Sequence, residues 1–288
     1  MQTFQNILFP VDFSERCAAA APFIETLAMK FSAKVTLLYV LDLPPAYFGE
    51  PFGFGTTMID LSAVREGRQS DLNGFLKDRF QGLSVTRVML EGDPAQNIVQ
   101  YSQEHKADLI AMPTHGMGVF RTLLLGSVTA KVLHDAECPV WTAPHVEESR
   151  ILTGPIERMM CAVDTSENSM PAMKSAAAIA NHLGAKLWLV HTLPGTESFP
   201  ERYFDQELQA FLENEARQTI WKMQAEAGLE LPLCIAVGSV AKVVRHAALE
   251  HACHLLVAGR GHLTARLGRL RTHVYSLIRE APCPVISV

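Results

Sequence analysis

The residues best suited to chemistry lie in one loop of the first half of the chain. Gly116 and Gly126 are separated by nine residues, and Ser127 follows at the start of a segment with helical period. Glycines let backbone N–H groups approach a ligand, and a helix start offers unpaired N–H groups and the positive end of a dipole. The loop therefore suits a phosphate, with the Ser127 hydroxyl as a further donor. The plainer alternative is a glycine-rich turn that only begins a helix.

A carboxylate lies where a nucleotide would place its sugar. Asp12 follows an apolar run and precedes Ser14, which stands before the first helical segment. A carboxylate at the end of a strand accepts hydrogen bonds from hydroxyls, such as those of a ribose. It equally serves to cap the helix that follows. With the loop at Gly126, Asp12 suggests a nucleotide site.

The elements that must position these residues alternate along the chain. Short apolar and β-branched runs are separated by longer segments of helical period. Such alternation builds a mostly parallel sheet with helices on both faces, and ligands bind beyond the carboxyl ends of the strands where the strand order reverses. That point is expected between the first and fourth strands, next to Asp12 and the loop after Met112. In the first half the predicted strands are 6–11, 34–40, 85–90, 109–112 and 139–142, and the predicted helices are 14–31, 59–80, 94–105 and 127–136.

The chain contains one domain twice. Segment 7–14 aligns with 159–166, segment 109–112 with 255–258, and Cys-Pro-Val at 138–140 with the same residues at 283–285. We therefore predict an α/β protein with two tandem flavodoxin-like (Rossmann-like) domains, each a five-stranded parallel sheet with helices on both faces. The predicted domains are 1–146 and 147–288, joined by a polar linker.

Composition excludes several classes of protein. The 288 residues include 25 Lys and Arg against 30 Asp and Glu, a net charge of −5, so no overall positive field exists for nucleic acid or an anionic membrane. No apolar run reaches the roughly 18 residues of a membrane span, and the N-terminus lacks the pattern of a signal peptide. The six cysteines form no C-x-x-C pair. We expect a cytoplasmic protein with free thiols and with no nucleic-acid or membrane partner.

Taken together, these motifs resemble the universal stress protein family in its tandem form. The resemblance rests on Pro-Val-Asp-Phe-Ser at 10–14, Thr-His-Gly at 114–116, Leu-Leu-Leu-Gly-Ser-Val at 123–128 and both Cys-Pro-Val segments. It implies a stress-response regulatory protein that binds ATP or a related adenine nucleotide, with or without Mg²⁺. The residues that the resemblance implies are Asp12 for the ribose, the backbone at Val40 for the adenine, and the loop positions Pro113, Gly116, Gly126, Ser127 and Val128 for the phosphates.

One loop position departs from the family pattern. The nucleotide-binding branch carries G-x2-G-x9-G-[ST], and Pro113 replaces its first glycine. Proline has no N–H to donate, so a nucleotide-free interaction protein of the same fold is the alternative. The chain contains no G-x-S-x-G elbow, H-E-x-x-H or Walker A run. We therefore assign no catalytic residue and expect, at most, slow ATP hydrolysis.

The second copy departs further. Arg271 stands where the first copy has Gly126, which disfavours ATP binding of the same kind. Residues 251–279 contain arginines but no Asp or Glu, so they form a candidate patch for an anion or an acidic partner. The commoner interpretation is that such arginines are solvated or paired within the fold. The candidate patch is Arg260, Arg266, Arg269 and Arg271.

Three further expectations concern metals, assembly and a loop. His246, His251, Cys253 and His254 lie close in sequence, but their spacing matches no usual zinc motif, so we assign no metal ligands. The resemblance implies that strands 139–142 and 284–288 pair within the chain as a pseudo-dimer, and it allows a homodimer. The aromatic, Gly- and Pro-rich loop 44–55 suits a lid, a partner-docking loop or a plain connection.

Overall fold

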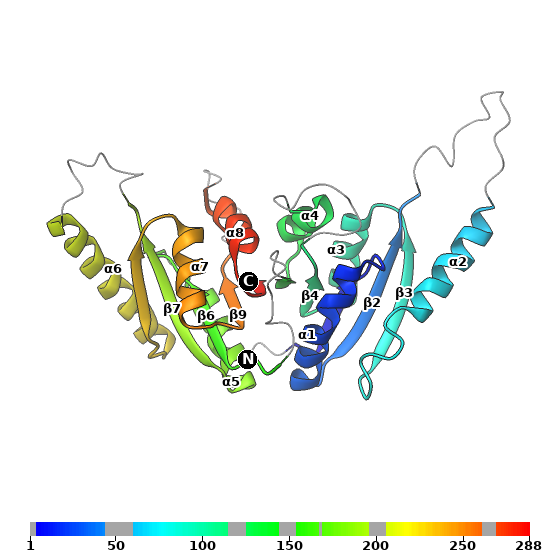
Figure 1. Ribbon diagram of the computed structural model, residues 1–288, viewed down its shortest axis with the longest axis horizontal. Coiled ribbons are helices and arrows are strands. Elements are labelled where there is room, and N and C mark those ends of the chain that lie inside the picture. The colour runs from blue at the N-terminus through cyan, green and yellow to red at the C-terminus, as the bar shows by residue number, and fades with distance from the viewer. Residues whose placement is uncertain are drawn as a thin grey trace, which may run out of the picture. The chain divides into compact units, whose positions relative to one another are not determined.

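The fold alternates strands and helices throughout (Figure 1). The structure is a computed structural model and describes residues 4–43, 60–114, 125–143, 154–166, 169–195, 206–260 and 269–288. The described chain divides into two compact units. The first comprises Phe4–Gly118 and Gly126–Cys138, and the second contains Pro139–Val288. The predicted α/β fold with a mostly parallel sheet is confirmed.

The first unit contains four described strands, all parallel, in the order β3-β2-β1-β4. β1 pairs with β2 on one side and with β4 on the other, so the strand order reverses between β1 and β4, as predicted. The elements are β1 (Asn6–Pro10), α1 (Glu15–Phe31), β2 (Lys34–Leu41), α2 (Leu61–Gly74), β3 (Val85–Glu91), α3 (Pro94–Glu104), β4 (Leu109–Met112) and α4 (Ser127–Asp135).

The second unit repeats this arrangement and adds two strands at one edge. Its described strands run in the order β5-β10-β9-β6-β7-β8, with β5 antiparallel to β10 and the other pairs parallel. The order reverses between β6 and β9. The elements are β5 (Val140–Thr142), β6 (Arg158–Ala162), α5 (Ser169–Leu183), β7 (Lys186–Leu193), α6 (Gln206–Ala227), β8 (Leu233–Val237), α7 (Val240–Glu250), β9 (Leu255–Ala258), α8 (Arg269–Glu280) and β10 (Val285–Ser287).

β5 belongs to the first repeat by sequence but pairs with the last strand of the second. Val285 lies opposite Thr142, and Ser287 lies opposite Val140. Both polar side chains are buried, and they donate to the carbonyl oxygens of Val285 and Val140 at 3.4 Å and 3.2 Å. The pairing of these two strands within one chain, which the resemblance implied, is therefore present. A homodimer stays a prediction.

The starts of α1, α3 and α4 lie within one residue of the starts predicted for the helices 14–31, 94–105 and 127–136. Ser14 Oγ accepts a hydrogen bond from the Cys17 N–H at 3.3 Å, and Asp93 accepts one from the Gln96 N–H at 2.7 Å. At α4 the N-cap is Gly126, and Ser127 is the first helical residue, as predicted.

The helix predicted over 59–80 is wrong at its C-terminal end, because α2 ends at Gly74. Arg87, on β3, donates hydrogen bonds from its guanidinium to the carbonyl oxygens of Leu72 and Phe75, both at 3.1 Å. These bonds satisfy carbonyl groups that the end of a helix leaves without intrahelical partners. A side chain from the strand that follows thus satisfies the carbonyl groups at the end of this helix.

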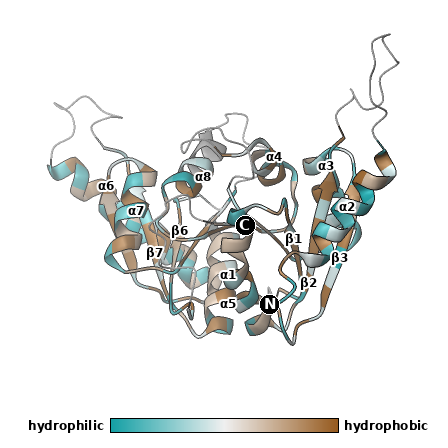
Figure 2. Ribbon diagram, turned by 45° about the vertical axis from the view of Figure 1, so that its right-hand side comes forward, coloured by the Kyte–Doolittle hydropathy of each residue, from teal (hydrophilic) through white to brown (hydrophobic). Residues whose placement is uncertain are grey.

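Strands and helices both contribute to the buried core, and the helices carry both hydrophilic and hydrophobic residues, as helices packed by one side on a sheet do (Figure 2). None of the described helices is both long and apolar enough to cross a bilayer. The predicted boundary between 146 and 147 falls within 144–153, outside the described residues, so it stays a prediction.

Candidate functional site

The carboxylate predicted for the ribose lies at the carboxyl edge of the first sheet. Asp12 follows β1, beside Pro113, which follows the adjacent strand β4. Asp12 Oδ1 accepts hydrogen bonds from the Ser14 N–H and from the Cys17 thiol, both at 3.0 Å. One carboxylate oxygen thus organises the first turn of α1, as the plainer interpretation of Asp12 expected. The side chain is fixed in place at the edge where a ligand is expected.

The Cys17 thiol remains a donor to this carboxylate over the whole ordinary pH range. Burial first, and then the negative charge of Asp12, raise the pKa of Cys17 to about 12. A protonated thiol donates one weak hydrogen bond and carries no charge. Cys17 therefore supports the orientation of Asp12 and is unsuited to nucleophilic chemistry.

The backbone of Val40 faces the same edge. In a parallel ladder, alternate residues turn both their N–H and C=O groups to the same neighbouring strand. The Leu38 carbonyl accepts from the Val11 N–H at 2.9 Å, so Leu38 faces β1. Val40 lies two residues farther along β2 and has the same orientation, but β1 has already ended there. Its N–H and C=O groups point beyond the end of β1, toward the side of the sheet where Asp12 lies.

The start of α4 is tied to the end of β4. The Gly126 N–H donates to the Thr114 carbonyl at 2.9 Å, and the Thr129 hydroxyl donates to the Pro113 carbonyl at 3.1 Å. Gly126 has no side chain, and no side-chain hydrogen bond caps this helix. The N–H groups of Ser127 and of the residue after it lie in the first turn, where no intrahelical acceptor is available.

The structure therefore brings most of the predicted nucleotide residues to one edge of the first unit. They come from the ends of β1, β2 and β4 and from the start of α4. Gly116 and loop 44–55 lie outside the described residues. The residues brought together are Asp12, Val40, Pro113, Gly126, Ser127 and Val128.

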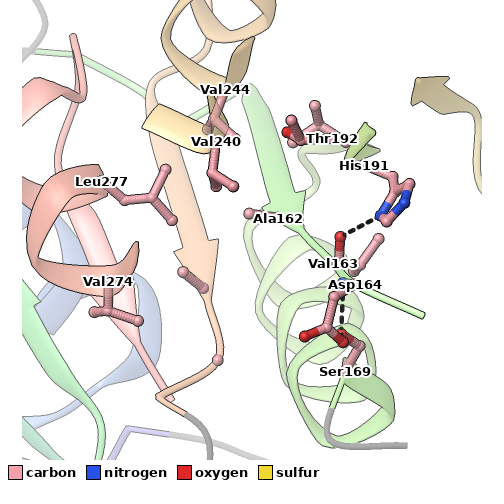
Figure 3. A pocket seen from close by; sticks show the side chains of 13 residues that line it. Ala162, Val163, Asp164, Ser169, His191, Thr192, Val240, Val244, Val274 and Leu277 are labelled. Atoms are coloured by element: carbon pink, nitrogen blue, oxygen red, sulfur yellow. Dashed lines mark hydrogen bonds between the residues drawn. The ribbon is translucent and has the colours of Figure 1, made fainter. Parts of the chain in front are cut away.

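Sequence reasoning missed a cavity at the matching edge of the second unit. It has a volume of about 110 Å³ and lies between the ends of β6, β7 and β9 and the helices α7 and α8 (Figure 3). Valine and leucine side chains from the two helices face it from one side. Polar side chains that follow β6 and end β7 face it from the other.

Asp164 contributes a carboxylate to this cavity from the position that matches Asp12. Its Oδ1 accepts from the Ser166 N–H at 2.9 Å, from the Ser166 hydroxyl at 2.6 Å and from the Ser169 hydroxyl at 2.7 Å. These three bonds use one oxygen and fix the carboxylate plane. Within the described chain, Oδ2 has no hydrogen-bond partner.

Thr192 occupies the position that matches Val40. Its hydroxyl is buried and, within the described chain, has no hydrogen-bond partner. The neighbouring His191 is buried and turns its ring away, with Nδ1 at 2.9 Å from the Val163 carbonyl (Figure 3). The Thr192 hydroxyl is therefore a buried polar group that the protein itself leaves unsatisfied.

The two repeats also differ where a phosphate would bind. Thr272 matches Ser127, but α8 begins at Arg269, three residues earlier in the alignment of the repeats. The N–H of a residue this far inside a helix has an intrahelical acceptor. Backbone donors that α4 offers at its start are thus used within α8, which supports the expectation that ATP does not bind here as in the first repeat.

The candidate arginine patch stays a prediction. The backbone N–H of Arg260 donates to the Val288 carbonyl at 2.7 Å and extends the pairing of β9 with β10. The side chains of Arg269 and Arg271, and all of Arg266, lie outside the described part of the chain.

The histidines and cysteines near the end of α7 have packing and hydrogen-bonding roles. The His251 ring stacks on Trp188 with centroids 5.0 Å apart, and its Nε2 lies 3.4 Å from Cys234 Sγ. His254 Nδ1 accepts from the Glu157 N–H at 3.0 Å. The described residues contain no group of three or more His, Cys, Asp or Glu side chains placed to hold a metal ion.

Comparison with known proteins finds the same family in both repeats. A family model described as the universal stress protein family matches residues 3–144 and again 155–288. The chain belongs to the universal stress protein family. It is a tandem universal stress protein, because each repeat matches the family separately.

Relatives and solved structures agree with this assignment. A universal stress protein from Methanocaldococcus jannaschii is 34% identical over 137 residues, 48% of this chain and 80% of that protein. One from Thermus aquaticus is 32% identical over 143 residues, 48% of this chain and 96% of that protein. The crystal structure of a universal stress protein from Archaeoglobus fulgidus covers 100% of this chain and 97% of its own, with a TM-score of 0.70 and 20% identity, which supports the fold.

Proposed function

We propose that this universal stress protein binds ATP or a related adenine nucleotide at the β1–β4 edge of its first repeat. The proposal rests on the start of α4, which lacks a side-chain cap and is held by hydrogen bonds of Gly126 and Thr129 to the end of β4. Unpaired N–H groups at a helix start attract phosphate oxygens. The protein then acts in a stress response through the nucleotide-dependent binding of a partner.

Each neighbouring group has a role in this proposal. The Ser127 hydroxyl and the N–H groups of Ser127 and Val128 bind the phosphates. Asp12 accepts from the ribose hydroxyls, and its fixed orientation reduces the entropy lost on binding. The backbone N–H and C=O of Val40 form a donor and acceptor pair for the edge of adenine.

We propose no protein ligands for Mg²⁺. The ion keeps several waters and commonly binds through substrate phosphates with few carboxylates. Where ATP is the ligand, Mg²⁺ would arrive with the phosphates and reduce their charge beside the Asp12 carboxylate.

A nucleotide-free interaction protein is the second candidate, and Pro113 is the observation that favours it. Proline offers no N–H, and its carbonyl is already used by the Thr129 hydroxyl. If this candidate is correct, Pro113→Gly should create nucleotide binding that the natural protein lacks.

The first experiment identifies what the protein carries. Freshly purified protein is denatured, released small molecules are identified by mass spectrometry, and the stripped protein is titrated with ATP by calorimetry. About one adenine nucleotide per chain supports the proposal. The absence of both a released nucleotide and a heat of binding supports the nucleotide-free candidate.

A single substitution tests whether the nucleotide binds to the first repeat. Gly126 has φ −58° and ψ 143°, a conformation that any residue adopts, so Gly126→Arg copies the second repeat without backbone strain. We expect Gly126→Arg to abolish ATP binding and Gly126→Ala, its control, to retain it. Unchanged ATP affinity in Gly126→Arg would overturn the assignment of the site.

A further inference from the structure

The cavity of the second repeat differs in chemistry from the nucleotide edge of the first. Its volume of about 110 Å³ approaches that of the engineered cavity of about 150 Å³ that binds benzene. It therefore has room for one ring. Val240 and Val244 on α7 and Val274 and Leu277 on α8 form an apolar wall (Figure 3).

The opposite wall carries two oxygen atoms, one part-exposed and one buried, that have no hydrogen-bond partner in the described chain. Asp164 Oδ1 is saturated by hydroxyl and N–H donors, while Oδ2 has no partner in the described chain. The Thr192 hydroxyl lies on the same side of the cavity, buried and unpartnered within the described residues. A carboxylate oxygen accepts hydrogen bonds and repels anions, so this wall selects a ligand with an O–H or N–H donor and no negative charge.

The space arises from substitutions between the repeats. Ala258 ends β9 and lines the cavity, where the matching residue of the first repeat is the buried Met112. Gly259 follows, where the first repeat has Pro113. Val274 replaces Thr129, so the hydroxyl that ties α4 to its strand has no counterpart in α8. Two smaller residues at the strand end leave room that the larger pair would fill.

We infer that the second repeat binds a small aromatic molecule that carries a hydroxyl or N–H donor and no negative charge in this cavity. The ring packs on the valines and leucine of α7 and α8, and the donor binds Asp164 Oδ2. The Thr192 hydroxyl supplies a second polar contact. This inference does not depend on nucleotide binding by the first repeat, because its residues belong to the second unit alone.

The test compares three probes that share one ring. Benzyl alcohol carries a donor, toluene carries none, and benzoate replaces the donor with a negative charge. Binding to the full chain is measured by NMR titration. We expect benzyl alcohol to bind and toluene to bind about tenfold more weakly, since one buried hydrogen bond to a charged group is lost. Benzoate should not bind. Benzoate binding as tight as that of benzyl alcohol would overturn the inference, and so would the failure of benzyl alcohol to bind.

Three variants locate the site. Ala258→Met copies the first repeat and fills the space, so it should abolish benzyl alcohol binding. Asp164→Asn keeps an acceptor for the donors at Oδ1 but turns an NH₂ group to the open position, so it should weaken binding about tenfold. Thr192→Val also copies the first repeat, and it replaces Ala258→Met in the test if Ala258→Met fails to fold. Binding that survives Ala258→Met, or survives Thr192→Val and Asp164→Asn unchanged, contradicts the inference.

ATP binding, measured in the same variants, distinguishes the cavity from the proposed nucleotide site. Ala258→Met should leave ATP binding unchanged, and Gly126→Arg should leave benzyl alcohol binding unchanged. Displacement of benzyl alcohol by ATP in Gly126→Arg would show that the cavity is a second nucleotide site, and it would overturn the inference while leaving the first site intact.

Discussion

At the scale of single residues, the two repeats hold matching aspartates in the same way. Asp12 and Asp164 each commit Oδ1 to the start of the following helix. The donor from that helix is the Cys17 thiol in the first repeat and the Ser169 hydroxyl in the second. The hydroxyl is the stronger donor, so Asp164 is the more firmly fixed of the two.

The unpartnered hydroxyl of Thr192 predicts a stabilising substitution. Thr192→Val keeps the shape of the side chain and removes a buried group without a partner, so the ligand-free protein should gain about 1 kcal/mol of unfolding free energy. Denaturant unfolding measures the change. Thr142→Val is the matched control, because the Thr142 hydroxyl donates to the Val285 carbonyl and its removal should destabilise. A destabilised Thr192→Val would contradict the prediction.

His254 predicts a loss of stability in weak acid. Burial first, and then the positive charge of Arg158, lower the pKa of His254 below its usual value of 6.5. The unfolded chain then binds a proton more readily than the folded one as the pH falls through 6.5, so the contribution of neutral His254 is present above that pH and is lost below it. Asparagine at this position retains an acceptor for the Glu157 N–H.

The measurement is thermal unfolding between about pH 7 and about pH 5, the range in which histidines titrate. His254→Asn should lose less stability over this range than the natural protein. The exposed His246→Asn controls for the removal of a histidine from the same unit. Equal pH dependence in His254→Asn and the natural protein would count against the prediction.

At the scale of elements, the ends of helices are set by contacts as much as by local sequence. α2 is the clearest case, since its C-terminal carbonyls are bound by Arg87 of β3. Beyond α2, Phe80 has a φ of 58° and is 2% exposed, so the chain turns back to bury an aromatic ring. Its N–H donates to Glu25 of α1 at 2.8 Å.

Removal of the Arg87 guanidinium should loosen the end of α2. Arg87→Met keeps the apolar stem but leaves two carbonyls without donors, at a cost of about 1.5–3 kcal/mol for hydrogen bonds from a charged group. The Phe75 N–H, bonded to the Asp71 carbonyl at 2.8 Å, should then exchange faster with deuterium. Arg87→Lys is the intermediate control, because it retains the charge without the planar fork. Unchanged exchange at Phe75 would contradict this role.

Local signals in the sequence predicted the ends of the strands of the first repeat to within one residue, because β-branched and apolar runs act over a few residues. The end of α2 could not be predicted from such signals, since Arg87 lies far along the chain. Motifs predicted the nucleotide edge of the first repeat. They missed the second cavity because side-chain volume creates it, although the alignment of Met112 with Ala258 contains the signal.

At the scale of the whole molecule, the two repeats differ at the edges where we propose that ligands bind. The proposed nucleotide site rests on an uncapped helix start, and the proposed cavity site rests on an apolar wall opposite Asp164. Under these two proposals, the tandem chain responds to two ligands of different character. A cytoplasmic location and a homodimer remain predictions.

The pairing of β5 with β10 predicts how the second unit behaves in isolation. A fragment that begins at residue 139 retains β5, whereas one that begins at 154 leaves the β10 edge with its N–H and C=O groups unpaired. Exposed apolar edge strands pair with other chains. Light scattering after gel filtration should find the 154–288 fragment more strongly self-associated than the 139–288 fragment, which keeps the β10 edge paired. A monomeric 154–288 fragment would show that the free edge of β10 does not pair with other chains.

The β5–β10 ladder also sets the order of events during synthesis. Thr142 and the Val285 carbonyl that it binds are 143 residues apart, so a ribosome completes β5 long before it makes the partner strand. Domains generally fold one after another while the ribosome synthesises the chain at about 5–20 residues per second. For several seconds, a hydrophobic strand that includes Trp141 has no neighbour on that side. Translation speed through the second repeat, and chaperones near the tunnel exit, would therefore decide how many chains pair β5 with their own β10 instead of with a strand from another nascent chain.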